Sequence, residues 1–183
     1  PNGASVYGGW TIERMVGKYC DNNDNPNGGT ITTEFGTVIA NGGRFCDESK
    51  FDIPFRSDVK LAGSTPLAWG VNFGAVYQTY PGSERVITWT PAASLLPGGR
   101  TNSETVILST PGTTFQPRYN QIDINLRKNF RHGSKSFSAQ FDVFNVTNSS
   151  SILTTNNAIG GSLGQIASIL KGRMPRIAFQ MRF

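Results

Sequence analysis

The sequence contains a single histidine, His132, among its 183 residues. A Ser-His-Asp triad needs a histidine between a nucleophile and a carboxylate, and zinc sites draw their ligands from several cysteines or histidines. His132 stands instead in a basic stretch with Arg131 and Lys135, where a solvated turn is the simpler interpretation. We therefore expect a protein that is not an enzyme, with no catalytic residues, no metal site and no cofactor.

Long apolar runs are missing as well. No stretch approaches the ~18 consecutive apolar residues of a membrane helix. No positively charged start leads into an apolar segment, so no signal peptide is predicted. The chain opens on Pro1 rather than on Met, and we expect it to be cut from a longer polypeptide.

Only two cysteines occur, Cys20 and Cys46, and they bracket a segment rich in Gly and Asn. Such a pair fits an oxidising compartment such as the periplasm or the cell surface. We predict one intrachain disulfide that closes this loop. Two unpaired thiols are the alternative, because spacing alone does not pair cysteines.

Positive charge is present without being concentrated. Lys and Arg number 17 against 12 Asp and Glu, which gives a net charge of +5. A nucleic-acid-binding protein gathers such an excess into a patch or stripe. Here the cations are scattered, apart from a denser group around 127–135. We expect no nucleic-acid partner.

Apolar and polar residues alternate in several stretches. In 173–183 every second residue is apolar, which is the period of a β-strand with one apolar and one polar face. Stretches 120–130 and 136–146 repeat the pattern, with Phe144 as an exception. A strand of a membrane β-barrel needs this arrangement, because one face meets lipid and the other the lumen. The residues assigned to the apolar face are Ile122, Ile124, Leu126, Phe137, Phe141 and Val143, followed in the last strand by Ile177, Phe179, Met181 and Phe183.

The connections between predicted strands alternate in length. Strands are predicted at 10–18, 51–63, 71–80, 120–130, 136–146 and 173–183, with short turns at 65–70 and 131–135 and long loops at 19–50, 81–117 and 147–165. We therefore predict an all-β fold, with 1–183 as one β-sheet unit. It is an antiparallel meander of about six long amphipathic strands, a partial transmembrane β-barrel with three long loops on one side. Two aromatic girdles are expected. One lies by the short turns (Trp10, Trp69, Phe130, Phe183), the other by the long loops (Tyr19, Phe51, Tyr80, Tyr119).

Several stretches together resemble a known family. They are NQIDINLRKNFR at 120–131, FDVFNVTN at 141–148, ILKGR at 169–173 and the final Phe183, with FDIPFRSDVKL at 51–61 and PGGR at 97–100. As a set they are similar to the C-terminal end of TonB-dependent outer-membrane receptors, above all those of the carboxypeptidase-regulatory-like type. The resemblance covers the chain from about residue 51 to Phe183.

This resemblance implies an energy-coupled importer in the outer membrane of a Gram-negative-type bacterium, or extracellular material derived from that membrane. Its partners would be the TonB system and the barrel-assembly machinery, which reads the final aromatic residue. Such receptors have 22-stranded plugged barrels. This chain supplies about six strands, no plug and no TonB box, so we expect a C-terminal fragment of a larger barrel. Membrane barrels need at least about eight strands, and the chain alone does not close one.

Three functions are consistent with this sequence. The first is a barrel fragment whose role belongs to the intact importer. The second is a self-assembling structural subunit, a ring, tube or filament, because six strands leave two open edges that recruit other copies. Its apolar face would then be covered by another copy, or by lipid or detergent. The third is a soluble β-sandwich adhesin or binding domain, which needs a second sheet over the apolar face.

Overall fold

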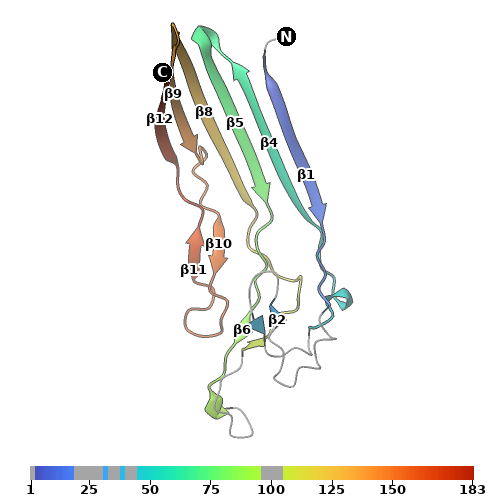
Figure 1. Ribbon diagram of the computed structural model, residues 1–183. Coiled ribbons are helices and arrows are strands. Elements are labelled where there is room, and N and C mark those ends of the chain that lie inside the picture. The colour runs from blue at the N-terminus through green and yellow to red at the C-terminus, as the bar shows by residue number, and fades with distance from the viewer. Residues whose placement is uncertain (1–2, 19–30, 33–37, 40–44, 96–104) are drawn as a thin grey trace.

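The computed structural model describes residues 3–18, 31–32, 38–39, 45–95 and 105–183. Neighbouring strands of its main sheet are all antiparallel and follow one another in chain order (Figure 1). The predicted all-β antiparallel meander of six long strands is therefore confirmed. The sheet is not closed into a barrel, and its first and last strands are its two edges. The six strands are β1 (Ser5–Glu13), β4 (Arg56–Pro66), β5 (Val71–Tyr80), β8 (Tyr119–His132), β9 (Lys135–Phe144) and β12 (Met174–Arg182).

The three long connections leave the sheet at the same end, as predicted (Figure 1). Two tight turns, at 67–70 and 133–134, close the opposite end. Short strand pairs lie within the long connections: β2 (Ile31–Thr32) with β3 (Val38–Ile39), β6 (Thr88–Trp89) with β7 (Val106–Ile107), and β10 (Ile152–Thr155) with β11 (Ile166–Ile169). The hairpin β10–β11 is not anticipated from the Ser-, Thr- and Asn-rich sequence around it.

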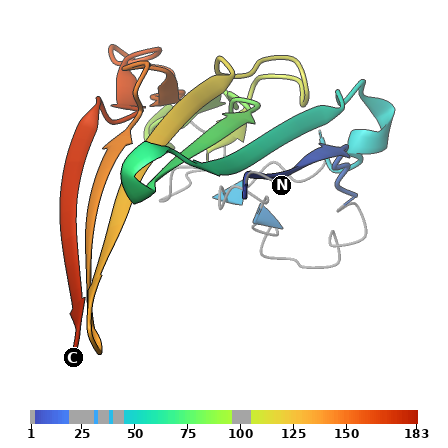
Figure 2. The ribbon, with the colours of Figure 1, turned by 90° about the horizontal axis from the view of Figure 1, so that it is seen from above.

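The main sheet is curved rather than flat. Seen from above, its strands follow an arc from β12 to β1 (Figure 2). The described residues contain no α-helix, only 3-10 turns at Glu48–Lys50, Ala68–Gly70 and Ala93–Leu95. Within the described ranges, no helix has the length and apolar character needed to cross a membrane. A second large sheet, which the β-sandwich alternative requires, is also absent from the described part of the chain.

The prediction of a first strand at 10–18 is wrong, because β1 runs from Ser5 to Glu13. Gly8 and Gly9 precede the predicted strand in the chain, yet both lie inside β1. Gly8 is opposite Leu61, and a Cβ on Gly8 would lie 2.3 Å from the carbonyl oxygen of Lys60. Glycine is therefore required here by close approach of two backbones within a sheet. The second strand also lies later than predicted, at Arg56–Pro66 rather than 51–63, whereas β5 has the predicted bounds.

The turn between β4 and β5 has an unusual backbone conformation. Trp69 and Gly70 both have positive φ, 60° and 70°, and the Leu67 N–H donates to the Val71 carbonyl at 2.7 Å. Two consecutive residues with positive φ match the right-handed twist of the flanking strands in a tight hairpin. Trp69 is 88% exposed and projects from this end of the sheet.

Candidate functional site

One side of the sheet, termed the apolar face, is built mainly from apolar side chains. Residues directly opposite each other in neighbouring strands share a face. Leu126 is opposite Phe73 on one side and Phe141 on the other, and Phe141 is opposite Ile177. The same register places every predicted apolar-face residue within a strand on this side. The apolar residues of this face are Val6, Trp10, Ile12, Val59, Leu61, Val71, Phe73, Ala75, Tyr77, Ile122, Ile124, Leu126, Phe130, Phe137, Ala139, Phe141, Val143, Ile177, Phe179 and Met181, and its polar residues include Thr65, Thr79, Asn120, Lys128, His132 and Lys135.

No protein layer covers the apolar face within the described residues. Phe179 is 69% exposed and Trp10 is also 69% exposed, and even Phe141, on an inner strand, is 41% exposed. The one buried hydrophobic residue of the described chain, Ile107, lies in the long connections rather than in the sheet. A water-soluble fold buries such side chains, because each Å² of apolar surface removed from water contributes ~25 cal/mol. The main sheet therefore has no hydrophobic core of its own.

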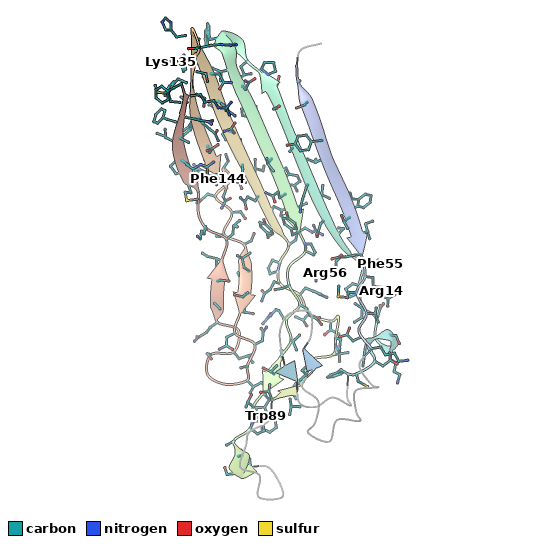
Figure 3. The ribbon with its side chains drawn as sticks, viewed as in Figure 1. Arg14, Phe55, Arg56, Trp89, Lys135 and Phe144 are labelled. Carbon is teal, nitrogen blue, oxygen red and sulfur yellow. The ribbon has the colours of Figure 1, made fainter. Side chains whose placement is uncertain are left out.

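Aromatic rings form a row across the apolar face near the tight turns. Phe130 lies 5.8 Å from Phe137, centroid to centroid, and Phe137 stacks on Phe179 at 5.8 Å. Two lysines of this face lie at the same end: Lys128 Nζ is 5.1 Å from the Phe130 ring centroid, and Lys135 Nζ is 6.0 Å from the ring centroid of Phe183. Figure 3 shows Lys135 at this end of the sheet.

The girdle prediction is only partly matched by these positions. Trp69, Phe130 and Phe183 lie at the tight-turn end, as expected. Trp10 does not, because it is opposite Val59 in the part of β1 nearer the long connections. Tyr80 and Tyr119 stack at 5.0 Å at the long-connection end, but they share a side with Gln78 and Gln121, opposite the apolar face, so they do not form a girdle on it.

The opposite side, termed the polar face, carries charged and amide side chains. Its residues include Glu13, Arg56, Asp58, Lys60, Asn72, Gln78, Gln121, Asp123, Asn125, Arg127, Asn129, Arg131, Ser136, Ser138, Gln140, Asp142, Arg176, Gln180 and Arg182. Phe144, the exception to the alternation, also lies on this face. The guanidinium of Arg176 stands 5.1 Å from its ring centroid, so the aromatic ring packs against a cation.

Asp142 is the best-buried charge of the sheet, at 4% exposed. Arg176 Nε donates to its Oδ2 at 2.8 Å, and Gln140 Nε2 donates to both carboxylate oxygens at 2.9 and 3.1 Å. The Asn125 amide also donates to Oδ1. Buried charges are tolerated when paired and hydrogen-bonded in this way. The main sheet therefore has the opposite burial pattern to a water-soluble sheet: the charged Asp142 is buried on the polar face, while Phe141 and Phe179 are exposed on the apolar face.

Asn145 anchors the base of the third long connection. It is 2% exposed and has a φ of 50°. Its amide donates to the carbonyls of Ser149 and Lys171, both at 2.8 Å, and its Oδ1 accepts from the Ser149 N–H at 2.9 Å. Its own N–H donates to Asp123 Oδ1 at 2.8 Å. One side chain therefore ties the two ends of the β10–β11 segment to each other, a role that the sequence does not reveal.

The second and third long connections pack against each other. Gln116, 6% exposed, donates from Nε2 to Thr155 Oγ1 at 2.6 Å, and the Ile159 N–H donates to the Thr88 carbonyl at 2.7 Å. Glu84 lies nearby and accepts the Gly112 N–H at 2.6 Å. Burial raises the pKa of the Glu84 carboxyl above its ordinary value, while the Gly112 hydrogen bond acts in the opposite direction.

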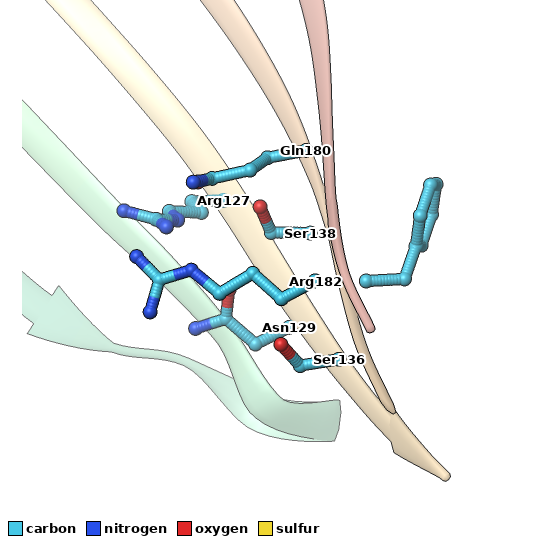
Figure 4. Close-up of a pocket in the computed structure, with 7 residues that line it drawn as sticks. Arg127, Asn129, Ser136, Ser138, Gln180 and Arg182 are labelled. Atoms are coloured by element: carbon cyan, nitrogen blue, oxygen red, sulfur yellow. The ribbon is translucent and has the colours of Figure 1, made fainter. Parts of the chain in front are cut away.

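A shallow pocket of about 230 Å³ lies on the polar face near the tight-turn end. It is lined by Arg127, Asn129, Ser136, Phe137, Ser138, Gln180 and Arg182. Figure 4 shows that the six labelled polar side chains, from β8, β9 and β12, project to the same side of the sheet. A hollow bounded by side chains of three strands fits the inner side of a curved sheet.

The described residues that could act in catalysis or bind a metal do not form a cluster. His132 pairs with Lys135 at the tight turn. Within the described part of the chain, no group of three or more His, Cys, Asp or Glu side chains could hold a metal ion. Cys20 lies outside the described residues, so the Cys20–Cys46 disulfide stays a prediction. Tyr19 of the expected girdle lies outside them too.

Comparisons with known proteins add no relative. No family model, no curated protein and no solved structure matches this chain.

Proposed function

We propose that this chain is part of the wall of an outer-membrane β-barrel of the TonB-dependent receptor kind, and that it serves transport rather than catalysis. The observation that carries the proposal is the inverted burial of the main sheet. Its apolar face is uncovered across six strands, while Asp142 on the polar face is 4% exposed. Lipid on one side and an aqueous lumen on the other satisfy both faces at once.

Strand length supports the same proposal. The six strands contain between 9 and 14 residues, and a tilted membrane strand needs ~9–11. Strands of soluble sheets are usually shorter, with a mode of ~5–6 residues. The long connections at one end and tight turns at the other also follow the usual asymmetry of outer-membrane barrels.

The ends of the apolar face are suited to a membrane boundary. Lys128 and Lys135 stand among phenylalanines at the tight-turn end, within cation–π distance of Phe130 and Phe183. Lysine side chains at such positions lay their methylene stems on apolar surface and keep the ammonium in water. In the proposed orientation this end lies at the periplasmic boundary, and the long connections face outward.

The resemblance described above suggests which barrel this is. It supports an energy-coupled importer in the outer membrane, with the TonB system and the barrel-assembly machinery as partners. In a closed barrel the edges of β1 and β12 pair with further strands, because each unsatisfied backbone group in hydrocarbon costs several kcal/mol.

The three tryptophans provide the test, because they lie at three different levels. Trp10 is on the apolar face, Trp69 in a tight turn, and Trp89 in the long connections, far from Lys135 (Figure 3). Three single-tryptophan variants, with Phe at the other two positions, are reconstituted in vesicles that contain brominated lipid. We expect strong fluorescence quenching of Trp10, intermediate quenching of Trp69 and none of Trp89. Equal quenching at all three positions, or none at Trp10, contradicts the proposal.

A second candidate function is self-assembly into a ring, tube or filament. It is favoured by the two edges, since neither β1 nor β12 has a second neighbouring strand among the described residues. Other copies could pair with these edges and cover Ile177, Phe179, Met181 and Phe183, which are 57–88% exposed. Lipid-free protein is examined by negative-stain imaging and by sedimentation, with the double variant Phe179→Glu, Met181→Glu as comparison. Ordered particles that the double variant abolishes support this function. A lipid-free monomer contradicts it.

A further inference from the structure

The pocket on the polar face is formed by a contrast in side-chain size between neighbouring strands. In β9, Ser136 and Ser138 are short. On either side, Asn129 and Gln180 are the direct cross-strand neighbours of Ser138, and Arg182 is the neighbour of Ser136. Long side chains on the two outer strands therefore rise around short ones in the middle strand, and a hollow of about 230 Å³ remains (Figure 4).

Two arginines, Arg127 and Arg182, line this pocket. Within the described residues, the side chains of Arg127 and Arg182 make no hydrogen bond and no ion pair. None of the described residues that line the pocket is acidic. The nearest acidic residue on this face of β9 is Asp142, whose oxygens are already engaged by Arg176, Gln140 and Asn125. Two positive charges thus share a concave site in which the described residues supply no counter-charge.

The remaining polar groups of the pocket are neutral hydrogen-bond donors. The serine hydroxyls and the Asn129 and Gln180 amides each offer N–H or O–H groups. Guanidinium groups bind oxyanions with two parallel hydrogen bonds, and charge-assisted bonds of this kind are about twice as strong as neutral ones. The volume is several times the ~30 Å³ that one water molecule occupies in the liquid, so an oxyanion of a few heavy atoms fits.

We propose that this pocket binds a phosphoryl group, as inorganic phosphate or as a phosphate monoester. Arg127 and Arg182 bind its charge from the two outer strands, while the hydroxyls and amides around Ser138 take the other terminal oxygens. A tetrahedral group with three terminal oxygens uses more of these donors than a planar carboxylate does. This inference is independent of membrane insertion, because it rests on the polar face alone.

Binding is measured on the full chain in neutral detergent at low ionic strength, by titration calorimetry with inorganic phosphate. We expect one saturable site, and at least a tenfold loss of affinity in each of Arg127→Gln and Arg182→Gln. The matched control is Arg14→Gln, which removes the same charge at the other end of the sheet and should change affinity less than twofold. Absence of saturable binding, or an equal loss in all three variants, overturns the proposal.

A second variant tests the pocket without altering its charge. Ser138→Gln fills the middle of the hollow and keeps both arginines, so it should also abolish binding; unchanged affinity overturns the proposed position.

Acetate should compete at least tenfold more weakly than phosphate, and equal competition overturns the phosphoryl assignment. Competition by glycerol phosphate and by phosphatidic acid in mixed micelles then distinguishes a soluble phosphate ester from a lipid headgroup as the source of the phosphoryl group. Tighter binding of the lipid supports a headgroup, and equal binding supports a soluble ester.

Discussion

Replacing Phe179 by glutamate places a charge on the apolar face of β12. Phe179 is opposite Ala139, stacks on Phe137 and is 69% exposed in the chain alone. Its neighbour Gln180 is on the polar face, so Gln180→Glu introduces the same charge one residue away, on the other side of the sheet. The two variants therefore place the same charge at almost the same position along β12, one on the apolar face and one on the polar face.

The expected loss in free energy of unfolding is estimated from the exposed fraction of the Phe179 side chain. Complete burial of a phenylalanine contributes about 1.5–3 kcal/mol, and lipid would cover roughly two thirds of this side chain, which gives about 1–2 kcal/mol. A cationic residue on the lipid face destabilises a barrel by ~2–4 kcal/mol at the midplane and an acidic one by less, so we add about 1–2 kcal/mol. The total is about 2–4 kcal/mol, a change of between about one and three powers of ten in the folding equilibrium. For Gln180→Glu we expect less than ~0.5 kcal/mol.

The assay is urea unfolding of the chain in phospholipid vesicles, followed by tryptophan fluorescence. The urea concentration at the unfolding midpoint should be lower for Phe179→Glu than for the wild type and unchanged for Gln180→Glu. The slope of the transition should be unchanged in both variants. Equal midpoints for the two variants would refute the assignment of the apolar face to lipid. A lower midpoint for Gln180→Glu alone would refute the same assignment.

The other predictions concern single contacts. Asn145→Ala leaves buried backbone groups without partners and should destabilise the third connection by about 2–4 kcal/mol, measured as faster amide exchange at Ser149. Gly8→Ala should destabilise the sheet by about 1–3 kcal/mol through backbone crowding, whereas Gly9→Ala, with open space around its Cβ, is the control in the same urea titration. Because the folded-state pKa of Glu84 is raised, the folded state binds its proton more tightly. The stability of wild type relative to Glu84→Gln should therefore fall as pH rises from the unfolded-state value of ~4.3 through the folded-state pKa; the opposite slope contradicts the assignment. Cys20 and Cys46 should show one disulfide and no free thiol in a mass-spectrometric alkylation assay, and two alkylated thiols would disprove the pair.

Part of this protein is determined by its sequence alone. The two-residue period of a strand is a local property, so alternation identified apolar and polar faces before any pairing was known. The two short turns then indicate antiparallel neighbours for β4 with β5 and for β8 with β9, because a short connection leaves no room for a crossover. The predicted start of the first strand at residue 10 is wrong because Gly8 has a long-range cause: inside β1 the carbonyl of Lys60 leaves no room for a Cβ at this position.

Tertiary structure decided which side chains became neighbours. The ion pair of Asp142 with Arg176 and the contact of Phe144 with the same arginine depend on the register of β9 with β12. The bonds of Asn145 to Ser149 and Lys171 join the two ends of a 29-residue connection that the alternation does not describe. Periodicity assigns a side chain to a face. Only the alignment of strands that are distant in sequence decides what it meets there, because a shift of two residues would keep every face and replace every partner.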